Sequence, residues 1–311
     1  MWIGSCELGI VFLSDSHFQL PFPIHNRQPP IHNLPPMQKI LFLFFVAVMT
    51  VPSVFAEDQK PEPGKQVPQQ MTVPKSTSIW VWRGGEDFSQ LLRTPKPLDE
   101  SGTETLQYLL YLPKEYQPDA EKDWPLLLFL HGAGERGDDL DLVTVHGPPK
   151  RIAKEPEFAE KCPFIVVSPQ CLKDHYWSPA QLQLLLDNIE KIYNVDSKRI
   201  YVTGISMGGF GTWMLTADTP ERFAAVAPIC GGFDPEQAKK FADVPVWTFH
   251  GDVDRAVPVK LTQNMVKAIE DADGKKIKMT IYPGVDHDSW TQTYINKELY
   301  DWFLEHSLEE K

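Results

Sequence analysis

The sequence contains little cysteine and little positive charge for its length. Four cysteines in 311 residues are too few for a disulfide-stabilised scaffold, and a chain of this length can bury a full core without disulfides. The 30 lysines and arginines are outnumbered by 42 aspartates and glutamates, which leaves a net charge of -12. Because nucleic acids and anionic membranes are bound by basic patches, this balance argues against both classes of partner.

The motifs of common metal and phosphate sites are also missing. The sequence has no H-E-x-x-H, no paired C-x-x-C and no G-x-x-x-x-G-K. We therefore expect the chain to need neither a metal ion nor an organic cofactor.

No apolar run is long enough to cross a membrane, which takes about 17–25 residues. The ten apolar residues at 40–49 follow Met37 and Lys39, and small or apolar residues come after them. This order is typical of a secretory signal peptide. We expect residues 37–56 to be a cleaved signal peptide, with an uncleaved N-terminal anchor as the alternative. The mature protein would then be secreted or periplasmic, without stable insertion in the membrane.

The segments on either side of this signal lack the pattern of a folded domain. Residues 1–36 carry six prolines, so we interpret them as a misassigned upstream segment and Met37 as the true start. Residues 57–75 are polar and hold four prolines, which predicts a flexible leader. The catalytic domain is then expected over residues 76–311.

Short apolar runs in this region predict a three-layer α/β fold. They are continuous rather than alternating, which suits strands buried on both faces of a mostly parallel sheet. The clearest runs cover residues 126–131, 164–168, 199–204 and 244–250, and further candidates are 105–112, 224–229 and 278–282. Helical patterns separate them, one of which starts at Ser178 with Pro179 and Gln181 in a capping box. Alternating strands and helices over 200 residues indicate an α/β/α sandwich.

A G-x-S-x-G motif lies between the strand at 199–204 and the helical stretch at 210–216. Such a motif in this context predicts a nucleophile elbow, a tight turn that exposes the oxygen of Ser206. The turn also places the serine at a helix N-terminus, where backbone N–H groups favour negative charge.

A second glycine-rich loop, H-G-A-G-E-R-G, covers residues 131–137. It matches G-x-G-x-x-G, but dinucleotide binding also needs an acidic residue at the end of the next strand, and Pro169 and Gln170 stand there. The alternative is a loop that supplies an oxyanion donor. On this interpretation the N–H groups of Ala133 and Met207 form an oxyanion hole, and His131 is structural.

A third loop, H-G-D-V-D-R-A-V-P, starts at His250 and offers two carboxylates, Asp252 and Asp254. His287 lies downstream of both acids and of the serine, in a loop after a strand, and is the candidate base. Four aromatic residues near these loops are candidates for substrate contact, with packing in the core or at its rim as the alternative: Tyr176, Trp177, Phe210 and Trp290.

With these residues in this order, the chain resembles the α/β-hydrolase superfamily from about Leu106 to about His306. It is most similar to the secreted esterase branch, which groups feruloyl and acetyl esterases, polyhydroxybutyrate depolymerases and dienelactone hydrolases. The catalytic domain of prolyl oligopeptidases is a near relative. The resemblance implies a catalytic triad of Ser206, Asp254 and His287, because the family's acid is the D of H-G-x-x-D-x-x-V-P.

The expected function is a serine carboxylic-ester hydrolase that works through an acyl-enzyme. Its substrate would be a small-molecule or polysaccharide-linked ester, and residues 135–160 and 171–180, which depart from the family pattern, leave the ester unidentified. A serine peptidase of the prolyl oligopeptidase type is one alternative, although residues 57–105 are too few for that family's propeller. A non-catalytic binding protein is the other, and the three intact triad residues weigh against it.

Overall fold

The computed structural model describes residues 61–76 and 99–309. The predictions for the upstream segment 1–36 and the signal peptide 37–56 lie outside these ranges. Within them, no helix combines the length and the apolar character that a membrane span requires.

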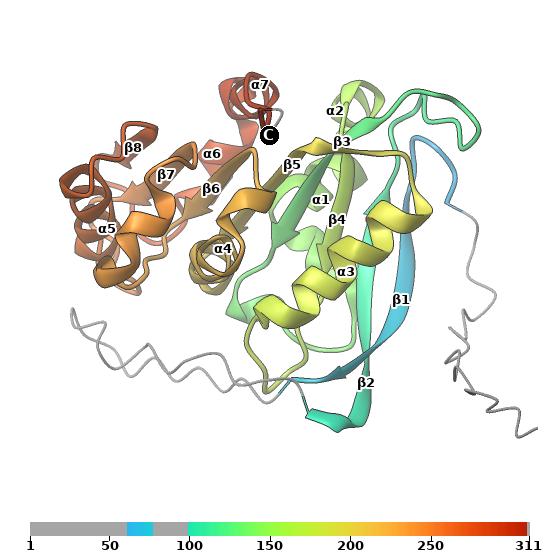
Figure 1. The fold of residues 1–311 in the computed structure, drawn as a ribbon, viewed down its shortest axis with the longest axis horizontal. Helices are drawn as coiled ribbons and strands as arrows, with labels where there is room; N and C mark the ends of the chain where they lie inside the picture. Colours follow the sequence, from blue (N-terminus) through green and yellow to red (C-terminus); the bar gives the residue numbers. More distant parts are fainter. Residues whose placement is uncertain (1–60, 77–98, 310–311) are drawn as a thin grey trace, which may run out of the picture. The chain divides into compact units, whose positions relative to one another are not determined.

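The described residues form one sheet of eight strands (Figure 1). Its order is β1-β2-β4-β3-β5-β6-β7-β8. The pairs β1–β2 and β2–β4 are antiparallel, and all the other pairs are parallel, which confirms the prediction of a mostly parallel sheet. The strands are β1 (Gln66–Lys75), β2 (Asp99–Tyr111), β3 (Trp124–Leu130), β4 (Ile165–Pro169), β5 (Val195–Ile205), β6 (Ala225–Ile229), β7 (Val246–Gly251) and β8 (Ile277–Tyr282).

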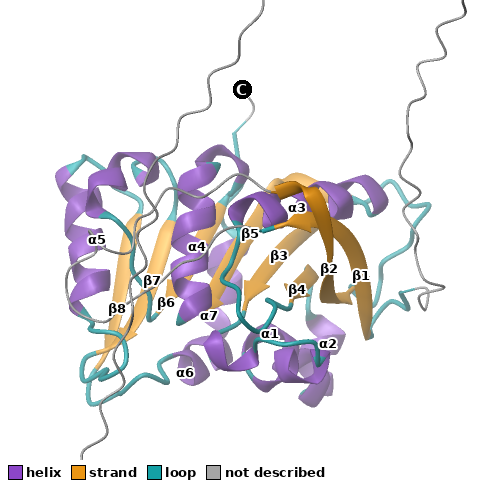
Figure 2. Ribbon diagram, turned by 90° about the horizontal axis from the view of Figure 1, so that it is seen from below, coloured by secondary structure: helices purple, strands orange, loops and turns teal. Residues whose placement is uncertain are grey.

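Helices cover both faces of this sheet and complete the three-layer sandwich (Figure 2). On one face lie α3 (Pro179–Ile192), α4 (Met207–Asp218) and α5 (Lys260–Asp271); on the other lie α1 (Gly147–Lys154), α2 (Pro156–Lys161), α6 (Trp290–Ile295) and α7 (Lys297–Leu304). Short 3-10 helices occupy four connections: η2 (Ala133–Glu135), η3 (Leu140–Val145), η4 (Pro220–Arg222) and η5 (Pro235–Phe241). Every residue of β3 is buried, because its alternate side chains pack into the two separate cores.

The prediction of a flexible leader over residues 57–75 is wrong for its second half, because residues 66–75 form β1. Val67 and Val73 are buried toward the core, in the alternating pattern of a strand with one covered face. Pro68 and Pro74 are tolerated because β1 pairs with β2 alone and is an edge strand, where a missing N–H costs no ladder bond. The folded unit therefore begins before residue 76.

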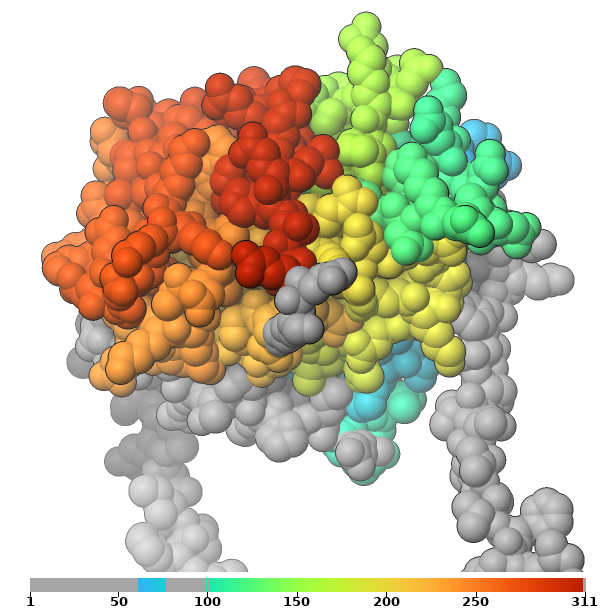
Figure 3. All heavy atoms as spheres, turned by 45° about the horizontal axis from the view of Figure 1, so that its top comes forward, coloured from blue at the N-terminus to red at the C-terminus, as the bar shows by residue number. Residues whose placement is uncertain are grey.

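Two further hydrogen bonds hold parts of this fold in place. The hydroxyl of Ser178 accepts a hydrogen bond from the N–H of Gln181 over 3.5 Å and so caps α3. This is one half of the predicted capping box, because the side chain of Gln181 donates to the carbonyl of Pro74 over 2.8 Å instead of turning back to Ser178. At the other end of the chain, the Tyr201 hydroxyl donates to the carbonyl of His306 over 2.8 Å. The C-terminal segment consequently lies beside the residues of β5, as the red and yellow atoms in Figure 3 show.

Candidate active site

The turn between β5 and α4 holds Ser206 in a strained conformation. Its φ is 51° and its ψ is -114°, a region where residues with a Cβ are uncommon. The N–H of Ser206 donates to the carbonyl of Ile229 over 3.0 Å and lies 3.3 Å from the sulfur of Cys230. The end of β6 therefore holds the turn in place, and the serine stays partly exposed directly before α4.

Gly208 allows α4 to begin against the end of β3. A Cβ on this glycine would lie 1.9 Å from the carbonyl oxygen of Leu130 and 2.8 Å from that of His131. Because both oxygens belong to the backbone, neither can swing aside as the end of a side chain could. The first turn of α4 thus lies against the start of the loop that contains Ala133.

Overpacking a core typically costs about 1–3 kcal/mol. We expect Gly208→Ala to lower the free energy of unfolding by an amount at the top of this range or above it. Gly134→Ala is the matched control, because a Cβ at Gly134 would meet no atom within 4 Å. Urea unfolding of both purified variants measures the difference. Equal unfolding midpoints for the two variants would contradict the close approach of α4 to β3.

The structure brings Ser206, His287 and Asp254 into one hydrogen-bonded row. Nε2 of His287 lies 2.9 Å from Oγ of Ser206, and Nδ1 of His287 lies 2.7 Å from Oδ2 of Asp254. A carboxylate can only accept hydrogen bonds, so Nδ1 donates to Asp254 and Nε2 is left to accept from the serine hydroxyl. Of the two candidate acids, Asp254 therefore contacts the histidine.

Hydrogen bonds tie the loop that carries Asp254 to the loop that carries His287. Arg255 donates to the carboxylate of Asp286 through its Nε over 2.7 Å and through its backbone N–H over 2.9 Å. The other candidate acid, Asp252, accepts from the N–H of Gly284 over 2.6 Å. These bonds hold the two loops side by side, and they give Asp252 a structural place outside the row.

The carboxylate of Asp254 is buried and surrounded by donors. Its Oδ1 accepts from the backbone N–H groups of Ala256 and Val257, each over 2.8 Å, and its Oδ2 lies 3.2 Å from Nε2 of His250. Burial by itself would raise the pKa of the Asp254 carboxyl, but hydrogen bonds from His250, His287 and Val257 outweigh it and hold that pKa well below its usual range. Asp254 therefore remains an anion at all ordinary pH values.

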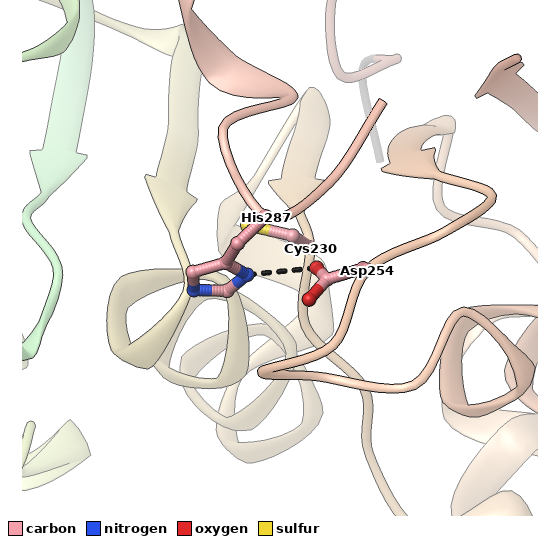
Figure 4. A group of neighbouring side chains, drawn as sticks. All are labelled: Cys230, Asp254 and His287. Atoms are coloured by element: carbon pink, nitrogen blue, oxygen red, sulfur yellow. Dashed lines mark hydrogen bonds and ion pairs between the residues drawn. The ribbon is translucent and has the colours of Figure 1, made fainter. Parts of the chain in front are cut away.

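Cys230 lies next to His287 and Asp254 (Figure 4). One ligand atom from each of the three residues lies within 4.8 Å of the others, a spacing that a metal ion could bridge. However, Nδ1 of His287 is already bonded to Asp254, and burial raises the pKa of the Cys230 thiol well above its usual range. Because metals bind the thiolate, this cluster suits the hydrogen-bonded row better than a metal centre.

Cys162, Cys171 and Cys230 are all buried free thiols. Cys230 also has a positive φ of 40°, directly after β6. The strain at this residue and at Ser206 therefore falls on two neighbouring positions of the same site.

The loop after β3 places Ala133 at the start of η2, and Met207 is the first residue of α4. The first N–H groups of a helical turn have no partner inside the helix, so both residues present donors. His131 is fully buried, and its Nε2 accepts from the N–H of Cys171 over 2.9 Å. Burial lowers the pKa of His131 to about 4, which keeps the ring neutral and structural.

The four aromatic candidates for substrate contact have different positions. The half-buried ring of Trp290 lies 5.2 Å from that of His287, edge to face, and Phe210 is half-buried in the first turn of α4. Tyr176 is half-buried, and the guanidinium carbon of Arg136 lies over its ring, 5.3 Å from the ring centre of Tyr176. Trp177 is 3% exposed, packs in the core, and its indole donates to the carbonyl of His131, a position that favours the alternative of core packing.

His250 also contacts Asp254, a place in the site that its sequence motif alone does not indicate. Its position four residues before Asp254, at the end of a strand, is the signal that could have found it.

A model of the dienelactone hydrolase family matches residues 176–296. A bifunctional acetylxylan esterase/xylanase of Neocallimastix patriciarum is 27% identical over 173 residues, which are 52% of this chain and 23% of that protein. A poly(3-hydroxyalkanoate) depolymerase C of Paucimonas lemoignei is 41% identical over 51 residues, which are 16% of this chain and 12% of that protein. The chain thus spans less than a quarter of the length of these curated relatives.

Among solved structures, a thermostable esterase is 36% identical, with a TM-score of 0.59, and the match covers 67% of this chain and 61% of that chain. A Porphyromonas gingivalis dipeptidyl peptidase 4 has the same fold at 14% identity and a TM-score of 0.53, over 67% of this chain and 34% of that one. The sheet order, the turn that holds Ser206 and these similarities lead to one conclusion: the chain has the α/β-hydrolase fold.

Proposed function

We propose that this protein is a serine hydrolase that cleaves carboxylic esters, with Ser206 as nucleophile, His287 as general base and Asp254 as the acid that orients the base. One observation carries the proposal: the strained serine lies 2.9 Å from an imidazole whose other nitrogen lies 2.7 Å from a buried carboxylate. Because a free serine hydroxyl is a weak nucleophile, it needs a base placed in this way.

The proposed reaction begins when Ser206 attacks the ester carbonyl and His287 takes the hydroxyl proton at Nε2. Asp254 holds the ring in the tautomer that leaves Nε2 free and stabilises the imidazolium that forms. His287 then gives the proton to the departing alcohol. Water attacks the acyl-enzyme with the help of the same base, which releases the acid and restores the serine.

The N–H groups of Ala133 and Met207 are the proposed oxyanion donors. Both begin helical turns at the same edge of the sheet, and the contact of Gly208 with Leu130 brings those turns together. Donors fixed by the backbone need no reorganisation when negative charge develops on the carbonyl oxygen. Trp290, beside His287, is the proposed contact for the group next to the scissile bond.

The proposed substrates are esters of small molecules or of polysaccharides. The acetylxylan esterase and the poly(3-hydroxyalkanoate) depolymerase among the relatives support this class. The test is a hydrolysis panel of short-chain aryl esters, acetylated xylan, feruloyl esters, 3-hydroxybutyrate esters and proline-peptide anilides. Faster cleavage of the anilides than of any ester would favour a peptidase, and no turnover of any compound would favour a binding protein.

We expect kcat/KM for a neutral ester to fall about tenfold per pH unit on the acid side, because His287 must be neutral to accept the serine proton. Asp254 contributes nothing to this limb, because its lowered pKa keeps it ionised there. Above the limb the rate should reach a plateau. Steady-state rates across pH, with protein stability checked at each value, measure the profile. A fall in kcat/KM steeper than about tenfold per pH unit would indicate two titrating groups and contradict a single base.

We also propose that the protein is exported after cleavage of residues 37–56. The signal pattern in the sequence supports this: an apolar run of ten residues after Met37 and Lys39, followed by small or apolar residues. N-terminal sequencing of the exported protein should begin at Glu57. A mature chain that retains Phe18 or Ile31 would contradict both the proposed cleavage of residues 37–56 and Met37 as the start of translation.

A further inference from the structure

His250 stands at the end of β7, directly behind the carboxylate of Asp254. Its side chain is fully buried. Nδ1 lies 2.7 Å from Oγ1 of Thr262 on α5. Nε2 lies 2.8 Å from the carbonyl oxygen of Val257 and 3.2 Å from Oδ2 of Asp254. Both ring nitrogens therefore have close partners, and no water is needed to satisfy them.

The partners of His250 determine where its protons are. Thr262 has a single hydroxyl proton, which it donates to the carbonyl oxygen of Gly231 over 2.7 Å. Toward Nδ1 of His250 it can then only accept, so Nδ1 carries a proton. At Nε2, the carbonyl of Val257 and the carboxylate of Asp254 are both acceptors, so Nε2 carries a proton as well.

We infer that His250 is a buried imidazolium cation that positions the carboxylate of Asp254 and balances its charge. This inference rests on the proposed role of Asp254 as the triad acid. His250 touches no reacting atom and acts through Asp254, so it is a positioning residue. Its ion pair with Asp254 explains how a carboxylate can stay charged with no exposed surface, because a buried charge is tolerated when it is paired and hydrogen-bonded.

The pair also limits how strongly Asp254 favours a charged His287. The titratable groups that face Asp254 are His250 from β7, His287 from the loop after β8, and the protonated Cys230 from the end of β6. Arg255, next in the chain, is turned to Asp286 at the surface. With His250 neutral, Asp254 would be an uncompensated anion and would favour the imidazolium form of His287 more strongly.

The charge of His250 can be observed without any activity. We expect 15N NMR of the full chain, labelled at histidine, to give both nitrogens of His250 the shifts of protonated ring nitrogens between about pH 6 and 8. The resonances are identified by their loss in His250→Gln. One unprotonated nitrogen in this range would overturn the inference.

Thr262→Val tests the functional part while it keeps the histidine. Valine has nearly the shape of threonine but cannot accept the Nδ1 proton, so His250 should become neutral. We expect the midpoint of the acid limb of kcat/KM to move to higher pH and kcat to fall about tenfold with KM unchanged, by analogy with the 10–100-fold effect of partners that orient a functional histidine. His250→Gln should show the same shift with a larger loss of kcat.

Two variants control this experiment. Thr262→Ser keeps the hydroxyl and should restore the wild-type profile. Thr248→Val removes a similar buried bond on the same strand as His250, from its hydroxyl to the carbonyl of Pro228 over 2.9 Å, and should leave the profile unchanged. A Thr262→Val profile that matches Thr248→Val would overturn the positioning role. Full activity of Ser206→Ala would instead end the proposed function and leave the NMR result intact.

Discussion

Ser206→Ala is expected to lower kcat for ester hydrolysis by about 10⁴–10⁶-fold while the protein remains folded. The alanine variant keeps the strained turn and the backbone donors, but it has no oxygen to attack the carbonyl or to receive the acyl group. The loss should appear in kcat, because the groups that bind the substrate are unchanged. Steady-state kinetics on the best ester of the panel, with circular dichroism as a check of folding, measure it.

Covalent labelling separates loss of the nucleophile from loss of binding. A serine-directed phosphonate should modify the wild-type protein at Ser206, and labelling should be lost in His287→Ala because the hydroxyl then has no base. A chelator should leave both activity and labelling unchanged. A Ser206→Ala variant with a tenth of wild-type activity, or activity that a chelator removes, would place the chemistry elsewhere.

Asp254→Asn is expected to lower kcat by about 10⁴-fold, and Asp252→Asn to leave it nearly unchanged. An amide can donate a hydrogen bond to Nδ1 of His287, which then favours the tautomer whose Nε2 carries the proton and cannot accept from the serine. Asp254 lies 2.7 Å from that nitrogen, whereas Asp252 is exposed and bonded to the N–H of Gly284. The two substitutions remove the same charge from the same loop.

The comparison of these variants also tests the geometry. Each is assayed across pH, because loss of the anion at Asp254 should also weaken the support for a charged His287. Equal kinetics for Asp252→Asn and Asp254→Asn, or a larger loss for Asp252→Asn, would refute the assignment of the acid. Thermal unfolding of both variants shows whether a loss of rate is a loss of fold.

Much of this site can be predicted from the sequence, because its motifs consist of residues that are close together in the chain. The strand followed by G-x-S-x-G predicts the elbow, since only glycine permits the approach that Gly208 makes to Leu130. Continuous apolar runs predict buried parallel strands for the same local reason, as the fully buried β3 shows. The choice of Asp254 over Asp252 needed the family pattern, because spacing alone leaves both acids open.

Other features follow from which segments are neighbours in space. The sequence predicts a flexible leader where β1 lies, because Pro68 and Pro74 suit a loop equally well. Only the pairing with β2 at the edge of the sheet makes this segment a strand. The sequence leaves open whether Trp177 contacts substrate or packs in the core, and the close approach of Gly211 to its ring places it in the core.

The order of strands and helices, the two glycine-rich turns and the identities of the serine, the histidine and the candidate acids come from the chain alone, because turns and periodic patterns depend on residues close in sequence. The contact of His250 with Asp254 and Thr262, and that of Cys230 with Ser206, come from the tertiary structure. Hydrogen bonds between loops depend on how strands are ordered in the sheet, and that order is set by packing of the whole domain rather than by any one segment.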